Sequence, residues 1–131
     1  CKLVRTLERM GDHSFALCDL VHSHKIPSTI SMTSLPISVI PIWQMSIKLL
    51  ISNLRKRKFT EIHSAKSQLI SAQQDLLQYE EELRFSDIDL QDALFLDRVS
   101  ESLRRICAYS INMGEILMNI QTHRESSQVY S

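Results

Sequence analysis

Two pairs of acidic residues, each with a spacing of four, occur in segments that share one pattern. The hexapeptide LERMGD begins at position 7 and LDRVSE begins at position 96, so the two copies lie 89 positions apart. Residues four apart on a helix lie on one face, which pairs Glu8 with Asp12 and Asp97 with Glu101. Carboxylate oxygens are the preferred ligands of hard cations. The four acids are therefore candidate metal ligands, in one shared site or in two separate sites.

These acids also have an ordinary explanation. Arg9 and Arg98 directly follow the first acid of each pair and can neutralise it. Exposed acids on a helix are commonly hydrated or paired with a nearby base, and such pairs contribute little to stability. The alternative to a metal site is a solvated helix flank.

Other arrangements of reactive residues are sparse. A ferritin-like di-iron enzyme needs an acid-x-x-His pair on each of two helices, and Asp19 with His22 is the only such pair in the chain. With two Gly in all, the chain lacks a glycine-rich loop of the kind that cradles phosphates with its backbone. We therefore expect a protein that is not an enzyme.

The composition is that of a single helical domain. Its 131 residues suffice for one hydrophobic core, and only two Gly and three Pro interrupt them. Fifteen acids balance fifteen bases, so no overall field attracts nucleic acid or anionic membranes. Three Cys do not suggest a disulfide framework. We expect a cytoplasmic protein with Cys18 and Cys107 in its core, or as a redox pair if their helices touch.

Apolar residues that recur every three or four positions predict four helices and no strand. The first helix spans residues 2–24 and must end before Pro27. The second begins near Pro41, since proline suits a first helical turn, and ends in the basic run at 55–58. Those cations complement the helix dipole and are too few for a nucleic-acid surface.

The third and fourth helices follow after short connections, which predict antiparallel neighbours. The third runs from Thr60, a candidate N-cap, to about Arg84. The fourth begins after the cap residues at 86–89 and continues to about His123, followed by a polar tail at 124–131.

The connection before the second helix is unusually apolar. Residues 26–47 contain no charged side chain, but three Pro and many Ser and Thr exclude a membrane-spanning helix. Some apolar residues of this linker are expected to pack on the bundle, and the candidates are Ile30, Met32, Leu35 and Ile37.

The spacing also predicts which side chains face the core. They are Leu3, Leu7, Met10, Ser14, Leu17 and Val21 in the first helix; Ile40, Trp43, Ile47, Leu50, Ile51 and Leu54 in the second; Ile62, Ala65, Leu69, Ala72 or Gln73, Leu76 and Leu83 in the third; and Leu96, Val99, Leu103, Ile106, Ser110, Met113, Leu117 and Ile120 in the fourth.

The segment LERMGDH at Leu7–His13 resembles the signature of the PhoU family of phosphate-regulation proteins. That family has two tandem three-helix repeats with an acid-x-x-x-acid motif in each, and the spacing of 89 suits this duplication. Asn53–Leu83 is similar to the family's junction between first and second helices. The second motif departs from the pattern, because Asp97 and Glu101 exchange the usual acid types and Ser100 stands at the Gly position.

The resemblance implies an all-α, antiparallel, PhoU-like helix bundle. Residues 1–25 would be the last helix of a first repeat, 26–40 a linker, 41–123 a complete second three-helix repeat, and 124–131 a flexible tail. Two further helices would then precede this sequence.

The resemblance also implies a non-enzymatic regulator of phosphate uptake and phosphate-starvation signalling. It would bind iron, manganese, magnesium or zinc through Glu8, Asp12, Asp97 and Glu101. It would contact a phosphate ABC transporter or a sensor kinase and associate with itself, because the first helix would expose apolar surface. Direct nucleic-acid binding and membrane insertion are not expected. The alternative is a metal-free helical interaction module or the effector module of a transcription regulator.

Overall fold

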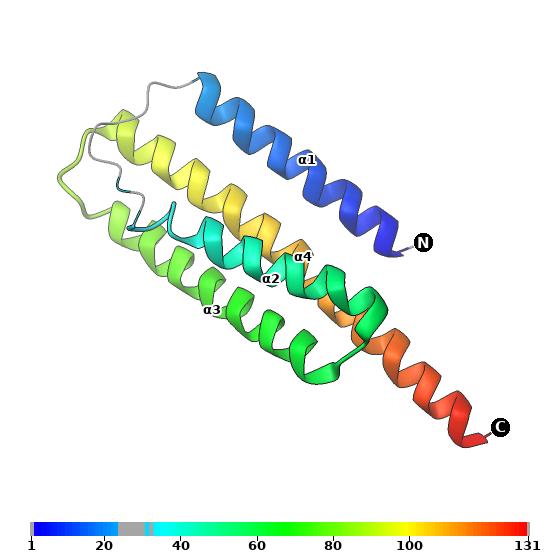
Figure 1. The fold of residues 1–131 in the computed structure, drawn as a ribbon. Coiled ribbons are helices and arrows are strands. Elements are labelled where there is room, and N and C mark those ends of the chain that lie inside the picture. Colours follow the sequence, from blue (N-terminus) through cyan, green and yellow to red (C-terminus); the bar gives the residue numbers. More distant parts are fainter. Residues whose placement is uncertain (1, 24–30, 32, 131) are drawn as a thin grey trace.

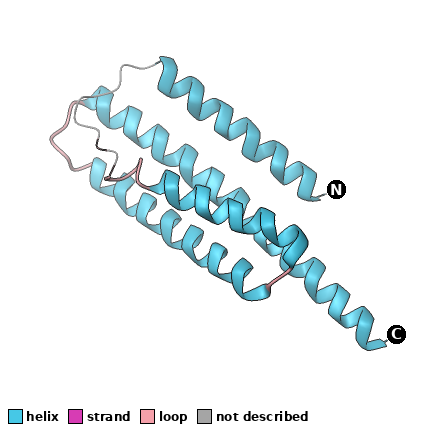
Figure 2. Cartoon of the chain, in the orientation of Figure 1, coloured by secondary structure: helices cyan, strands magenta, loops and turns pink. Residues whose placement is uncertain are grey.

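The fold consists of four helices in a computed structural model, which describes residues 2–23, 31 and 33–130, with side chains up to residue 120 (Figures 1 and 2). The helices are α1 (Lys2–Ser23), α2 (Val39–Lys56), α3 (Phe59–Leu83) and α4 (Leu90–Tyr130). No strand occurs in the described residues. The predicted all-α class is therefore confirmed.

Helices α2, α3 and α4 form a three-helix bundle in which each contacts the other two. In the described residues, α1 packs on the outside of this bundle and contacts no helix other than α4. Successive helices run in opposite directions, so α3 is antiparallel to both α2 and α4, and α1 is antiparallel to α4 (Figure 1). Of the four helices described, α4 alone contacts all three others.

The helix boundaries differ from the predicted ones at three points. Helix α2 already begins at Val39, which leaves Pro41 within its first turn. Helix α3 begins at Phe59 after an extended Lys58 that makes no side-chain cap bond, so Thr60 is not its cap. Helix α4 continues to Tyr130, past the predicted end near His123. No Gly or Pro follows position 114, and polar residues alone do not stop a helix.

Most of the predicted core residues are buried. In α3 and α4 the predicted stripes face the interior, with the exception of Ile120, which is exposed. Helix α1 buries Met10 and the unpredicted Thr6, whereas Leu7 is exposed. The buried apolar residues are Met10, Val39, Leu50, Ile62, Ala65, Leu69, Ala72, Leu76, Phe95, Leu96, Val99, Leu103, Ile106, Cys107, Met113 and Leu117.

In α2 the predicted stripe continues one turn too far. Ile51 and Leu54 are exposed, whereas Ser46 and Asn53 are buried. The buried positions recur at 46, 50 and 53, a spacing that fits a helix face as well as the predicted one. The apolar character of Ile51 and Leu54 therefore gave the wrong face at the end of α2.

The linker prediction is confirmed where it can be followed. Leu35 and Ile37 are half-buried and pack against the core, whereas Ile30 and Met32 lie outside the described residues. Within the described part of the chain, no helix combines the length and the apolar character needed to cross a bilayer.

Candidate functional site

The first acid pair lies on the surface of α1. Glu8 and Asp12 are both exposed, on the side of α1 that does not face α4. Neither forms an ion pair with another described residue. Both carboxylates are therefore accessible to solvent, to a cation or to a partner.

The second acid pair is half-buried on α4, and its two members line different cavities. Asp97 lines a pocket between the end of α3 and the start of α4, together with Glu80 and Arg84. Glu101 lines a groove between α1 and α4 and accepts a hydrogen bond from Arg105 Nη2 at 2.8 Å. The spacing of four places both acids on one side of α4, but the two carboxylates line separate cavities.

A shared four-carboxylate site is not formed. Among the residues that the structure describes, no group of three or more His, Cys, Asp and Glu side chains is close enough to hold a metal ion. Glu8 with Asp12, and Asp97 with Glu101, can each supply at most two carboxylates. Any metal bound at either pair would need further ligands from water or a partner.

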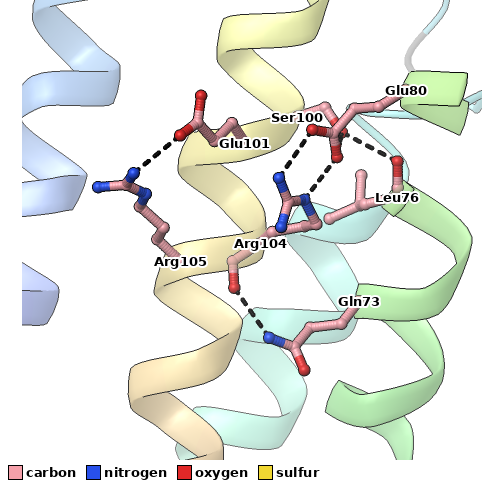
Figure 3. Close-up of polar contacts among 7 residues, drawn as sticks. All are labelled: Gln73, Leu76, Glu80, Ser100, Glu101, Arg104 and Arg105. Atoms are coloured by element: carbon pink, nitrogen blue, oxygen red, sulfur yellow. Dashed lines mark hydrogen bonds and ion pairs between the residues drawn. The ribbon is translucent and has the colours of Figure 1, made fainter.

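A polar cluster that was not predicted lies between α3 and α4 (Figure 3). Glu80 is buried and accepts hydrogen bonds from Arg104 Nε at 2.6 Å and Arg104 Nη2 at 2.9 Å. Ser100 Oγ donates to the same carboxylate at 3.0 Å, and Gln73 Nε2 donates to the backbone carbonyl of Arg104 at 3.2 Å. The hydrogen bonds that Arg104 donates to Glu80 raise the pKa of Arg104, as do the nearby charges of Glu80, Glu101 and Asp97, whereas burial lowers it. This cluster holds the two helices in register.

The contact between α1 and α4 combines aromatic and polar groups. The His13 ring stacks on the Tyr109 ring with centroids 5.3 Å apart and an interplanar angle of 25°. The Arg9 guanidinium carbon lies 6.0 Å from the centroid of the same ring. Ser110 Oγ lies 2.8 Å from Trp43 Nε1, which donates to it, and 3.1 Å from Met10 Sδ. Groups from α1, α2 and α4 therefore meet at Ser110.

The outer face of α1 carries an unpartnered stripe, which we call the open stripe and define as Leu7, Gly11, Phe15 and Cys18. These residues lie on one helix face by their spacing of three or four. Leu7 is 42% exposed and Phe15 is 76% exposed, and a Cβ added at Gly11 would meet nothing within 4 Å. Cys18 is also exposed, so its predicted core position is wrong, while Cys107 is buried as predicted. Both thiols are free.

The similar segment on α4 allows the exposed face of α1 to be compared with a corresponding face. Adding 89 to each position of the open stripe gives Leu96, Ser100, Arg104 and Cys107. On α4 three of these are buried, with Ser100 and Cys107 0% exposed, and Arg104 pairs with α3. The same face of the repeated helix is covered by neighbouring helices in α4 and is uncovered in α1.

The corner between α2 and α3 is fixed by Asn53. Its buried amide donates from Nδ2 to the Leu49 carbonyl at 2.8 Å and to Glu61 Oε2 at 2.9 Å. Its Oδ1 accepts a hydrogen bond from the Lys58 backbone N–H at 2.7 Å. Arg57 has a left-handed conformation at this corner, with φ 56°. Asn53 thus has a structural role.

Comparison of the chain with models of protein families, with curated proteins and with solved structures gave no match.

Proposed function

We propose that this chain is a non-enzymatic regulatory module of the PhoU type, which acts by protein–protein contacts in phosphate uptake or phosphate-starvation signalling. The observation that supports contact-based action is the open stripe of α1. Its counterparts on α4 are covered by helices, whereas Leu7 and Phe15 are exposed. The link to phosphate rests on the resemblance of Leu7–His13 and Asn53–Leu83 to that family.

The open stripe suits a helical partner. Exposed apolar residues in a row along a helix mark an interaction surface, and Gly11 permits close approach of another backbone because it has no side chain. On α4 the corresponding face is covered by helices of the α2–α3 hairpin. The proposed occupant of the open stripe is therefore an amphipathic helical pair, and the proposed sources are phosphate transporter or sensor kinase components.

Glu8 and Asp12 give this surface its proposed metal dependence. They are exposed beside the open stripe and unpaired among the described residues. Two carboxylates one helical turn apart can contribute oxygen ligands to iron, manganese, magnesium or zinc, with the remaining ligands from water or the partner. Asp97 and Glu101 form the weaker proposed site, since Glu101 already pairs with Arg105.

The experiment measures binding of the purified protein to purified phosphate transporter and sensor kinase components of the same organism by calorimetry. The Phe15→Glu variant places a charge in the open stripe and should weaken binding by about tenfold or more. The matched control is Phe85→Glu, at a residue that is 89% exposed outside α1; it should bind like wild type. Failure of all these components to bind, or equal loss in both variants, would contradict the proposal.

The metal part is tested separately by elemental analysis of the purified protein. Glu8→Ala/Asp12→Ala should lose bound iron, manganese, magnesium or zinc relative to wild type and to a matched Glu81→Ala/Glu82→Ala control, two exposed acids on α3. If the metal content does not depend on Glu8 and Asp12, the metal-free interaction module is the better description of the chain.

A further inference from the structure

A groove between α1 and α4 gathers positive charge. It has a volume of about 280 Å³ and is lined on the α1 side by Lys2, Arg5 and Arg9. These positions differ by three and four, so all three side chains lie along one face of α1. The groove lies on a different face of α1 from the open stripe, because it opens toward α4.

The positive charge of the groove is balanced only in part. None of the three cations forms an ion pair within the described part of the chain. Among the described residues, one carboxylate lines the groove, that of Glu115, whose Oε1 lies 4.0 Å from Lys66 Nζ outside it. Like charges at successive turns of one helix repel each other. A bound anion would relieve this repulsion.

The α4 side of the groove provides neutral groups that suit the same ligand. Tyr109, Asn112 and Asn119 line it, and their hydroxyl and amide groups can donate hydrogen bonds to phosphate oxygens. Tyr109 is held between His13, which stacks on its ring, and Arg9. The groove therefore has a positively charged wall, a wall of neutral donors and an aromatic ring fixed between them.

The length of the charged wall selects among anions. At a rise of about 1.5 Å per residue, the seven-residue step from Lys2 to Arg9 spans about 10 Å along the helix. One orthophosphate can contact only part of that length, whereas a chain of two or three phosphate groups can contact all three cations. Guanidinium groups also bind phosphate oxygens in a two-point geometry.

From this arrangement we propose that the groove between α1 and α4 binds a short chain of phosphate groups, as carried by a nucleoside triphosphate or by inorganic tripolyphosphate. Lys2, Arg5 and Arg9 hold the phosphates, and Asn112 and Asn119 donate hydrogen bonds from the opposite wall. The ligand is held by side chains, which is consistent with the absence of a glycine-rich phosphate loop from the sequence. This site is independent of the metal ligands and of the open stripe.

The test is calorimetric titration of the full chain with tripolyphosphate, ATP and orthophosphate at fixed ionic strength without divalent cations. Tripolyphosphate should bind with a dissociation constant below about 1 mM and at least about tenfold more tightly than orthophosphate. If ATP binds as tripolyphosphate does, the phosphate chain alone is recognised. Tighter binding of ATP assigns an additional contact to its nucleoside. Both of these results support the proposal.

The matched variants separate a built site from general attraction to positive charge. Lys2→Gln/Arg5→Gln/Arg9→Gln should weaken tripolyphosphate binding by about tenfold or more. Lys48→Gln/Arg55→Gln/Lys56→Gln removes the same charge from exposed positions on α2 and should leave binding within about twofold. Equal loss in both variants, equal affinity for orthophosphate, or no measurable binding would overturn the proposal. Circular dichroism of each variant checks that the helices are retained.

Discussion

Glu80 and Arg104 form a two-point ion pair that joins α3 to α4. The Arg104 Nε–Glu80 Oε2 distance is 2.6 Å and the Nη2–Oε1 distance is 2.9 Å. Ser100, which is fully buried, adds a hydrogen bond to the same carboxylate. Because two parallel hydrogen bonds require the guanidinium and the carboxylate to lie nearly in one plane, this pair restricts how α3 lies along α4.

Glu80→Ala is expected to destabilise the fold by about 2–3 kcal/mol, since it removes the acceptor of two Arg104 hydrogen bonds in a largely buried place. Ser100 keeps a longer hydrogen bond to the Leu76 carbonyl, at 3.4 Å. The measurement is urea unfolding followed by circular dichroism. The control is Glu101→Ala, which removes an exposed pair with Arg105 and should cost less than about 1 kcal/mol. Equal losses in the two variants would show that the buried pair has no special role.

Asn53→Ala is expected to cost about 2 kcal/mol or more. The substitution removes three hydrogen bonds of a buried amide and leaves the Lys58 N–H without its acceptor. Asn53→Asp should also destabilise, because its carboxylate would face the Glu61 carboxylate at hydrogen-bond distance. Thermal unfolding measures both effects. The control is Gln44→Ala, at an exposed position of the same helix, which should change the stability by less than about 0.5 kcal/mol. If Asn53→Ala leaves the stability unchanged, the corner does not depend on this side chain.

The two glycines should respond to alanine in opposite directions. A Cβ at Gly114 would lie 2.7 Å from Lys66 Cγ, so Gly114→Ala forces Lys66 aside and should lower the melting temperature. At Gly11 a Cβ would meet nothing within 4 Å, and Gly11→Ala in a helix should stabilise the isolated protein by about 1 kcal/mol. Differential scanning calorimetry of the two variants compares them directly; a fall in both would show that Gly11 is already packed against another molecule.

Cys18 and Cys107 should differ sharply in thiol reactivity. Burial raises the pKa of Cys107 to about 12, so its thiol stays protonated and protected in the folded state, whereas Cys18 is exposed. In a Cys1→Ser background, iodoacetamide at pH 8 should label Cys18 first, and mass spectrometry identifies the site. Fast labelling of Cys107 in folded protein would contradict its burial.

The raised pKa of Cys107 also makes the stability of the fold depend on pH. The Cys107 pKa in the folded state, about 12, lies above the ordinary value of 9.0, so the neutral thiol favours the folded state. This contribution is fully present below pH 9 and is lost as the pH rises toward 12. A Cys107→Ala variant should therefore show a smaller loss of stability between pH 9 and 11 than wild type does.

The sequence predicted the helices because apolar spacing and proline positions are local signals. It was less reliable about which face of a helix is covered. Helix α1 has two faces with apolar residues at helical spacing, one with Met10 and Leu17 and one with Leu7 and Phe15. Spacing alone cannot tell which of the two has a neighbour. Exposure of Leu7 could be established only from the position of α4.

The buried polar residues could not be predicted, because their role depends on another helix. Glu80 and Asn53 read as ordinary helix-surface residues in the sequence, and their burial requires Arg104 and Glu61 as partners. The acid pairs were located on the correct helices, but a metal site depends on further ligands in space. The repeat spacing suggested a comparison between α1 and α4, and the packing of the helices then showed that the corresponding face of α1 is exposed.

Among the helices that the structure describes, α1 packs against α4 alone, so its attachment depends on a single helix–helix interface. Local opening of a protein takes place in cooperative units of structure, and α1 can form one such unit. Detachment of α1 breaks the stacking of His13 on Tyr109 and the contact of Met10 with Ser110, and leaves the contacts among α2, α3 and α4 in place. A partner of the kind proposed for the open stripe would therefore act on a helix that can be held or released as a unit, while the three-helix bundle behind it stays intact.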